Sequence, residues 1–588
     1  MNEQNAWLTW STELAEKVGD ILGTKVEAND LVPPQDANWG DLSYPCFRAA
    51  KSLGKNPAEL AQMVAHGLQG KLDWVAEVVA MGPYVNIRLQ VAGAVERVIQ
   101  DVEAQGADYG MLPMSATGPV VFEYANPNTH KEIHIGHLRL FILGAAIIRV
   151  MKAAGRPVIP VSYINDVGSN VAKCLWQLVR AHEGSVMQLS EQAAKELLER
   201  IPAERHTGKY LGQLYTESTL AAEEPGSKEE ISYVLAQLEA HTPAWEILWR
   251  ETHGWCVQEL KQIFQEVGVD VEKQYFESDY LDESSRLVDE LLAKGIAKES
   301  QGAIIVDMEE QKLGVLLLRK SDGNLLYAAK DLPLADQKMQ DYPQASALQV
   351  MTDVRQVPYI KQLAEVMKRR GITLPFLSMG YELVRLPEGA MSSRKGNIVT
   401  YQALRDAVLE YALQGVTERH PEWSKEKVED TARQLAFAGI IFSMLRQDND
   451  KIVTFEMKEA LSFDGATGPY CQYAVIRLSS ILRKAANKGL KPSKDVPNAY
   501  AHASEKALAL SLAAFPHVVA LAGRDQRPSV IAHWCVEAAQ NVNAFYRDVP
   551  VMDATPDEAA SRLRLAQAAK QVLTLGLGLL GIAVPEEM

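Results

Sequence analysis

A strand–helix–strand pattern within residues 120–164 constrains the fold of this chain more than any other feature. The apolar run VVFEY at 120–124 leads into a polar loop, and apolar residues at helical spacing then extend from about 135 to 154. Gly155 stands where a helix commonly ends, and a second strand-like run covers 158–164. Two strands joined by one helix form a βαβ unit, so the pattern predicts a parallel sheet.

The loop after the first strand is where a sheet of this kind binds ligands, because it lies at the carboxyl end of a parallel strand. It ends in His134-Ile135-Gly136-His137, at the start of the helix. Free N–H groups at a helix N-terminus suit a polyphosphate, and Gly136 lets a bulky ligand approach the backbone. His134 and His137 share one helical face, so both can donate hydrogen bonds to one phosphate group. Two surface histidines at a helix start are the alternative interpretation, which the flanking βαβ pattern disfavours.

A second motif, MSSRKGN at 391–397, lies far downstream. It predicts a small cationic loop that can close on reacting phosphates, with Arg394 and Lys395 neutralising a pyrophosphate leaving group. Taken alone, the segment fits a basic surface turn better, because such turns are common.

Composition and periodicity divide the chain into three regions. Residues 1–112 have the pattern of a small α+β domain, and a linker rich in Gly, Pro, Ser and Thr joins them to the sheet domain at 113–455. Residues from about 175 to 300 are mostly helical and charged, which predicts an insertion into the sheet domain. Residues 456–588 are almost wholly helical and predict an all-α helical bundle. The fold class is therefore α/β, with flanking α+β and all-α domains.

Charge and cysteine content narrow the class of protein. The net charge is −15, which disfavours nucleic-acid binding over the whole surface, but residues 461–588 carry 13 Lys and Arg against 11 Asp and Glu. The five cysteines are far apart and form no C-x-x-C pair, so we expect neither disulfides nor a structural metal. No signal peptide and no apolar run near the length of a membrane helix is evident, which predicts a cytoplasmic protein with no membrane partner.

The two motifs together resemble those of the class I aminoacyl-tRNA synthetases. Further segments narrow the resemblance to the arginyl-tRNA synthetase family, and with Gly40-Asp41 and GPYVN at 82–86 they cover nearly the whole chain. They are EYANPNTHKEIHIGHLR at 123–139, YINDVG at 163–168, KSDGNLLYAAKDL at 320–332, GPYCQY at 468–473, NAFYRDVPV at 543–551 and GLGLLGIAVPEEM at 576–588.

The resemblance implies a Rossmann-like catalytic domain and an arginine–tRNA ligase activity. L-Arginine and ATP would give arginyl-adenylate and pyrophosphate, and the arginyl group would pass to tRNA(Arg) with release of AMP. Mg²⁺ would accompany the ATP, and no enzyme-bound covalent intermediate is needed, so catalysis would rest on positioning and charge stabilisation. The resemblance assigns catalysis to His134, His137, Lys131 and Lys395, and ATP binding to His134, Gly136, His137, Ser392 and Lys395.

Arginine demands a particular pocket, because its guanidinium is planar, always charged and carries five N–H donors. A selective site offers carboxylates and neutral acceptors in a matching fork. Tyr327 and Asp331 are four residues apart, so on a helix they share a face. The resemblance places the arginine site on Glu123, Asn128, Tyr327, Asp331 and Gln356.

The chain departs from the class pattern at several positions. Ala390 and Ser393 stand where the K-M-S-K-S loop has lysines, and the resemblance implies that Lys131, three residues before the first histidine, supplies the missing charge. The other departures concern the substrate pockets, where Asn170 replaces a usual Gln, Tyr359 a usual His and Ala145 a frequent Asp.

The helical C-terminal region resembles the anticodon-binding domain of the same family. The tyrosines of its shared segments, Tyr470, Tyr473 and Tyr546, are candidates for stacking on unpaired bases of the tRNA, with core packing as the alternative. The N-terminal region resembles the domain that contacts the tRNA elbow, and the family implies a monomer. Other hypotheses remain: a non-enzymatic RNA-binding relative, a small-molecule nucleotidyltransferase, or a synthetase for a different amino acid.

Overall fold

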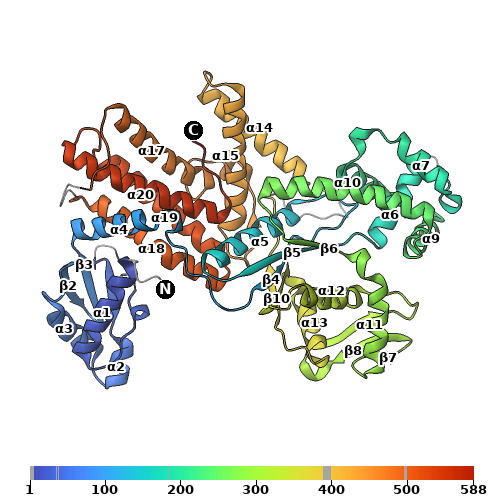
Figure 1. The fold of residues 1–588 in the computed structure, drawn as a ribbon, viewed down its shortest axis with the longest axis horizontal. Coiled ribbons are helices and arrows are strands. Elements are labelled where there is room, and N and C mark those ends of the chain that lie inside the picture. Colours follow the sequence, from blue (N-terminus) through green and yellow to red (C-terminus); the bar gives the residue numbers. More distant parts are fainter. Residues whose placement is uncertain are drawn as a thin grey trace. The chain divides into compact units, whose positions relative to one another are not determined.

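The computed structural model describes residues 6–32, 34, 36, 39–182, 184–387, 399–494 and 500–588 (Figure 1). They form two compact units. One consists of Met1–Pro113, Ala153–Gly155 and Leu461–Met588, and the other of Met114–Lys152 and Arg156–Ala460. The predicted parallel sheet lies in the second unit.

That sheet has five strands in the order β11-β10-β4-β5-β6, and every neighbouring pair is parallel. The helix α5 (Ile135–Ala153) joins β4 to β5 and confirms the βαβ prediction. The chain adds β5 and β6 on one side of β4, and β10 and β11 on the other. The order therefore reverses between β4 and β10, and the carboxyl ends of these strands border a crevice of the kind that binds ligands. The strands are β4 (Val120–Glu123), β5 (Val158–Ile164), β6 (Lys273–Phe276), β10 (Ala347–Asp353) and β11 (Phe376–Tyr381).

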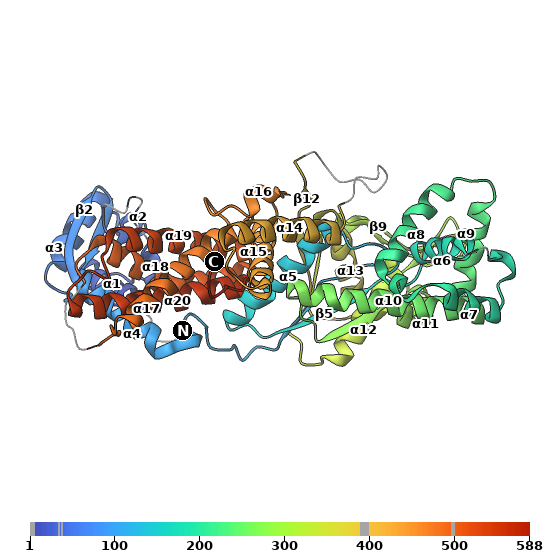
Figure 2. The same ribbon diagram turned by 90° about the horizontal axis from the view of Figure 1, so that it is seen from above.

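Between β5 and β6 the chain forms a helical insertion, whose helices lie close together in Figure 2. Its helices bury a core of their own around Trp176, Trp245 and Trp255. The range expected for the insertion, 175–300, extends too far, because β6 pairs with β5 and so returns the chain to the main sheet. A strand of four residues is too short to show a period in the sequence. The helices are α6 (Ser169–Ala181), α7 (Glu191–Arg200), α8 (Gly208–Ala221), α9 (Ser227–Glu239) and α10 (Pro243–Val267).

After β6 the chain forms α11 (Leu281–Ala293) and a separate antiparallel sheet of three strands. The strand Gly314–Arg319 belongs to this sheet and not to the parallel one. Its strands and the helices α12 and α13 that follow share an apolar cluster with β5, β6 and β10. The elements are β7 (Lys298–Ser300), β8 (Ala303–Met308), β9 (Gly314–Arg319), α12 (Tyr327–Asp341) and α13 (Val357–Arg369).

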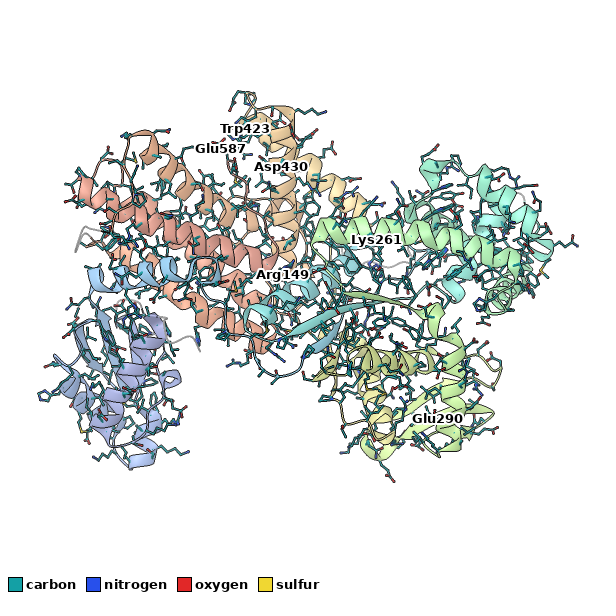
Figure 3. All side chains as sticks on the ribbon, in the orientation of Figure 1. Arg149, Lys261, Glu290, Trp423, Asp430 and Glu587 are labelled. Carbon is teal, nitrogen blue, oxygen red and sulfur yellow. The ribbon has the colours of Figure 1, made fainter. Side chains whose placement is uncertain are left out.

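Long-range contacts join α5 to distant parts of the same unit. Arg149 of α5 donates to the carbonyl oxygen of Gly268, directly after α10, at 3.3 Å (Figure 3). Arg139 is fully buried and donates to the carbonyl oxygens of Glu382, Leu383 and Asp448. The start of α5 is therefore tied to the segment after β11. The remaining elements of this unit are β12 (Val384–Arg385), α14 (Tyr401–Arg419), α15 (Lys425–Leu445), β13 (Val453–Thr454) and α16 (Met457–Ala460).

The other unit combines the N-terminal α+β region with the C-terminal helices. Its small sheet has the order β1-β3-β2, and in Figure 2 the four C-terminal helices run alongside one another. Arg564 of α20 forms ion pairs with Glu96 and Glu103 of α4, which joins the two regions. The elements are α1 (Ala6–Leu22), β1 (Leu42–Pro45), α2 (Phe47–Leu53), α3 (Pro57–Leu68), β2 (Val75–Met81), β3 (Tyr84–Leu89), α4 (Val91–Gln105), α17 (Gly468–Asn487), α18 (Ala503–Asp525), α19 (Pro528–Asp548) and α20 (Pro556–Leu580).

Among the described helices, α18 alone has the length and apolar composition needed to cross a membrane. This helix differs from the expectation that no apolar run comes near that length. It packs against α19, α4 and α20 and buries Leu508, Phe515 and Val519. Its Glu505 is fully buried in an ion pair with Arg562 of α20. These contacts are those of a core helix.

Candidate active site

A cavity of about 480 Å³ lies at the carboxyl ends of β4, β5 and β10. Its wall is completed by α12, by α13 and by the loop that leads from β4 to α5. The cavity brings together His137 and all five residues that the family resemblance assigns to arginine, namely Glu123, Asn128, Tyr327, Asp331 and Gln356. These residues come from two segments, 123–137 and 327–356, that lie far apart in the sequence, so folding alone unites them.

Glu123 ends β4 at the base of this cavity and is already neutralised by the protein. Its carboxylate forms a buried ion pair with Lys338 of α12. Asn126 donates to the Oε1 atom of Glu123 at 2.7 Å and accepts from the backbone N–H of Tyr163 at 2.9 Å. Glu123 therefore holds Lys338 and Asn126 in place, and the ammonium of Lys338 offsets its negative charge. Lys338 was missed in the sequence: it lies two turns after Asp331 in α12 and carries no signal of its own.

Asp331 projects from α12 into the same cavity and is only partly accessible. Burial raises the pKa of Asp331 to about 7, with smaller contributions from the charges of Glu123 and Glu277. Tyr359 donates its hydroxyl to the Oδ2 atom of Asp331 at 2.5 Å and partly offsets this rise. Tyr359 stands where the family usually has His, and here its phenol acts as a neutral donor. A cation that enters beside Asp331 favours the ionised carboxylate.

The other three predicted arginine contacts surround Asp331. Tyr327 begins α12 and is 66% exposed, one turn before Asp331. Gln356 accepts the hydroxyl hydrogen of Thr352 on its Oε1 atom, which leaves its amide N–H groups for a ligand. Asn128 pairs with Asn165 through the backbone in an isolated parallel bridge.

The two histidines stack with their ring centroids 3.8 Å apart. The Nδ1 atom of His137 accepts from the N–H of His134 at 3.3 Å, and the Nδ1 atom of His134 accepts from Gly136 at 3.1 Å. Burial lowers the pKa of His134 to about 4 and that of His137 well below its usual value. Both rings are therefore neutral near pH 7, and because Nδ1 accepts, the proton resides on Nε2. A side chain at Gly136 would approach the ring of His134 to 2.9 Å, so the glycine makes room for that ring.

Lys131 lies between the histidine motif and the helical insertion. Its ammonium is 5.7 Å from the ring centroid of Tyr215 in α8, and burial lowers the pKa of Lys131. The hydroxyl of Tyr215 donates to the Oδ1 atom of Asn170 at 3.2 Å, which orients the ring. At Gly212, one turn before Tyr215, a side chain would come within 2.7 Å of the backbone nitrogen of Glu132. The insertion thus packs directly on the Lys131-Glu132 dipeptide.

His130 is a residue that sequence reasoning missed. It is fully buried with a φ of +56°, and its two ring nitrogens contact the hydroxyls of Thr129 and Thr252 at 2.9 and 2.8 Å. Burial lowers the pKa of His130 to about 3, so the ring is neutral. It fixes the turn before the histidine motif against α10. Nothing in the sequence distinguishes this histidine from its neighbours.

Ser392 and Lys395 of the second motif lie outside the described residues. The segments on either side of that gap are tied to the start of α5. Ile135 donates to the carbonyl of Val399 at 3.3 Å, and Tyr401 donates to the carbonyl of Ile133 at 2.7 Å. On the other side, Arg139 holds the carbonyls of Glu382 and Leu383.

The three tyrosines predicted to contact RNA gather around Arg477 of α17. Its guanidinium lies 4.4 Å from the ring centroid of Tyr473 and 5.2 Å from that of Tyr546. Asn543 accepts from Arg477 at 2.6 Å and donates to the hydroxyl of Tyr470 at 3.0 Å. Tyr546 is 42% exposed, so this cluster opens to solvent.

Metal ligands do not gather anywhere in the part of the chain that the structure describes: no group of three or more His, Cys, Asp or Glu side chains could hold an ion. The five cysteines are buried and free.

Comparison with known proteins identifies the family. The model described as "tRNA synthetases class I (R), catalytic domain" matches residues 99–456, "DALR anticodon binding domain" matches 471–588, and "Arginyl tRNA synthetase N terminal domain" matches 9–89. An arginine–tRNA ligase of Bdellovibrio bacteriovorus is 35% identical over 570 residues, which cover 95% of this chain and 94% of the relative. The chain belongs to the arginyl-tRNA synthetase family.

Other relatives agree with this assignment. An arginine–tRNA ligase of Lactobacillus acidophilus is 31% identical, with 94% of this chain and 95% of the relative covered. The solved arginyl-tRNA synthetase of Thermus thermophilus superposes with a TM-score of 0.77 at 26% identity, covering 99% of this chain and all of that one. The predicted family and fold class are thereby confirmed.

Proposed function

We propose that this chain is an arginine–tRNA ligase that activates L-arginine with ATP and transfers the arginyl group to tRNA(Arg). One observation carries the proposal: the cavity at the sheet switch point unites the five predicted arginine residues with His137. The α-carboxylate of arginine attacks the α-phosphate of ATP, which gives arginyl-adenylate and releases pyrophosphate. The terminal ribose hydroxyl of the tRNA then attacks the acyl carbon and releases AMP.

Asp331 is the residue that we expect to recognise the guanidinium. The carboxyl group sits in a poorly solvated site, where an ion pair with a planar donor is strong and geometrically selective. Tyr359 holds one carboxylate oxygen and leaves the other for the ligand. Lysine would offer three donors in a different geometry and leave buried acceptors unpaired, at a cost of roughly 1–3 kcal/mol per group.

His134 and His137 serve the phosphates in this proposal. Each ring is neutral and presents an Nε2–H, so it can donate to the α-phosphate as charge develops there. A neutral donor keeps its proton while it stabilises the developing charge. Lys131 adds a positive charge on the side of the insertion, and Ser392 and Lys395 act from the second motif.

The remaining assignments follow the family. Mg²⁺ accompanies ATP and lowers the charge of its phosphates. The cluster of Tyr470, Tyr473 and Tyr546 offers ring faces to unpaired bases of the tRNA, and Arg477 supplies a positive charge among them. We propose the domain limits 1–112, 113–455 and 456–588, a monomer, and a cytoplasmic location.

A charging assay across the twenty amino acids tests the proposal. Purified protein, ATP with Mg²⁺ and tRNA should incorporate arginine alone, and ATP–pyrophosphate exchange should depend on arginine, with tRNA present if activation requires it. Exchange with another amino acid would reassign the substrate, and tRNA binding without any charging would favour the non-enzymatic relative. Removal of residues 461–588 should abolish charging, whereas a small-molecule nucleotidyltransferase would keep its activity.

A further inference from the structure

Tyr163 of β5 carries a buried hydroxyl that has no hydrogen-bond partner. The side chain is 5% exposed and lines the same cavity as Asp331. Among the described residues of that cavity wall, no other side chain has a buried polar atom left unpaired. An unpaired buried hydroxyl destabilises a fold, so its presence in a pocket calls for an explanation.

The acidic side chains near Tyr163 do not provide that partner: none of them accepts from its hydroxyl, and each is held by another group. Glu123 pairs with Lys338, and Glu277 pairs with Lys330. Asp166 accepts from the backbone N–H and the hydroxyl of Ser278, and Asp331 accepts from Tyr359. The phenol is thus surrounded by acceptors whose bonds are made elsewhere.

Burial and nearby negative charges keep this phenol protonated. Burial and the negative charges of Asp331, Glu277 and Glu123 raise the pKa of Tyr163 far above its usual value. The hydroxyl is therefore neutral at every physiological pH and keeps acceptor lone pairs. A guanidinium brings five N–H donors, more than the free oxygen of Asp331 can accept.

We propose that the hydroxyl of Tyr163 accepts a hydrogen bond from the guanidinium of bound arginine and is a specificity-determining residue of this site. The inference rests on the proposed ligase function and adds a residue to it. Tyr163 lines the same cavity as Asp331 and supplies a neutral acceptor to the fork that the guanidinium requires. Before arginine binds, the acceptor is held ready in place by the sheet, since Tyr163 pairs with Tyr275 of β6 in register.

Tyr163→Phe should weaken arginine binding without destabilising the free protein. Loss of an unpaired hydroxyl should leave the melting temperature of the free protein unchanged or raise it. The same loss should raise the KM for arginine in the charging assay by about tenfold, as expected for one hydrogen bond to a charged group, while kcat and the KM for ATP stay within about twofold. Isothermal titration with arginine should show the same loss of affinity.

Tyr275→Phe is the matched control, because it removes a phenol from the cross-strand neighbour. The Tyr275 hydroxyl donates to Asp341 at 2.7 Å and lies outside the cavity wall. Its loss should lower the melting temperature and leave the KM for arginine unchanged. A Tyr163→Phe protein with a wild-type KM for arginine would overturn the role of Tyr163 alone. Failure of the wild-type protein to charge arginine would instead refute the ligase function.

Discussion

The two ends of the active-site cavity reach electrical neutrality in opposite ways. At the acidic end, Lys338 balances the negative charge of Glu123. Asp331, whose pKa is about 7, is partly protonated near neutral pH. At the histidine end, burial removes the positive charge of His137, which lines the cavity, and of His134, which stacks on it, because burial lowers the pKa of both rings. A cation that binds at the acidic end restores the negative charge of Asp331. The histidine end instead offers neutral N–H donors to a ligand that is already charged.

Because of this difference, arginine and ATP meet ends of the cavity that differ in charge. An arginine side chain that enters the acidic end changes the protonation of the protein. The phosphates of ATP meet two rings whose pKa burial has already lowered, so His134 and His137 are neutral donors in the free protein. Variants at the two ends should therefore separate into effects on kcat and effects on the KM for arginine.

The largest effect is expected from His137→Ala. Loss of one preorganised donor to the developing charge should lower kcat about 10²–10³-fold with little change in the KM for arginine. His137→Asn retains a donor of similar reach and should recover part of the rate. Single-turnover adenylate formation measures the step directly. A variant that instead raises the KM for arginine would place His137 in the amino-acid pocket.

Asp331→Asn should act at the other end. Replacement of the carboxylate by a neutral amide should raise the KM for arginine about 100-fold, since a charged hydrogen-bonded pair contributes roughly 1.5–3 kcal/mol. The turnover number at saturating arginine should change much less. Glu277→Gln, which affects a neighbouring carboxylate paired with Lys330, is the control and should have a smaller effect on this KM. Equal effects of the two variants would show that Asp331 acts only through the general negative charge.

The sequence predicted the histidine end better than the acidic end for a physical reason. The histidine motif, its loop and α5 are contiguous, so a βαβ pattern was sufficient to place them. The acidic end joins β4, α12 and the start of α13, and periodicity contains no information on which distant residues meet. Resemblance to a family supplied Asp331 and Tyr327, but Lys338, His130 and the unpaired Tyr163 became visible only through their contacts.

The KM for arginine should depend on pH through Asp331 at the acidic end. Asp331 is protonated below about pH 7, and arginine binds the ionised form, so the KM for arginine should rise about tenfold between pH 8 and pH 6. The stability of the free protein should change with pH in the opposite direction to arginine binding. The folded state holds this proton more tightly than the unfolded chain, so the contribution of Asp331 to stability falls as pH rises from about 4 to 7. Asp331→Asn should remove both trends. Burial lowers the pKa of both histidines, so their protonation should contribute less than Asp331 to the pH dependence of the reaction.

The smallest expected effect concerns Tyr215, which connects the histidine end to the insertion. Tyr215→Leu removes the ring beside Lys131, and a partly desolvated cation–π contact is worth about 1 kcal/mol, so kcat for adenylate formation should fall roughly three- to tenfold. Tyr215→Phe keeps the ring and loses only the bond to Asn170, and it should retain most of the activity.

Lys131→Gln provides the test of mechanism for Tyr215. If Tyr215 acts by positioning Lys131, the Leu substitution should have little further effect on kcat once the ammonium is absent, so the two changes should be strongly non-additive. Melting temperatures of the single variants separate this coupling from a general loss of stability. Additive effects on kcat would show that α8 contributes to catalysis by a route that does not involve Lys131.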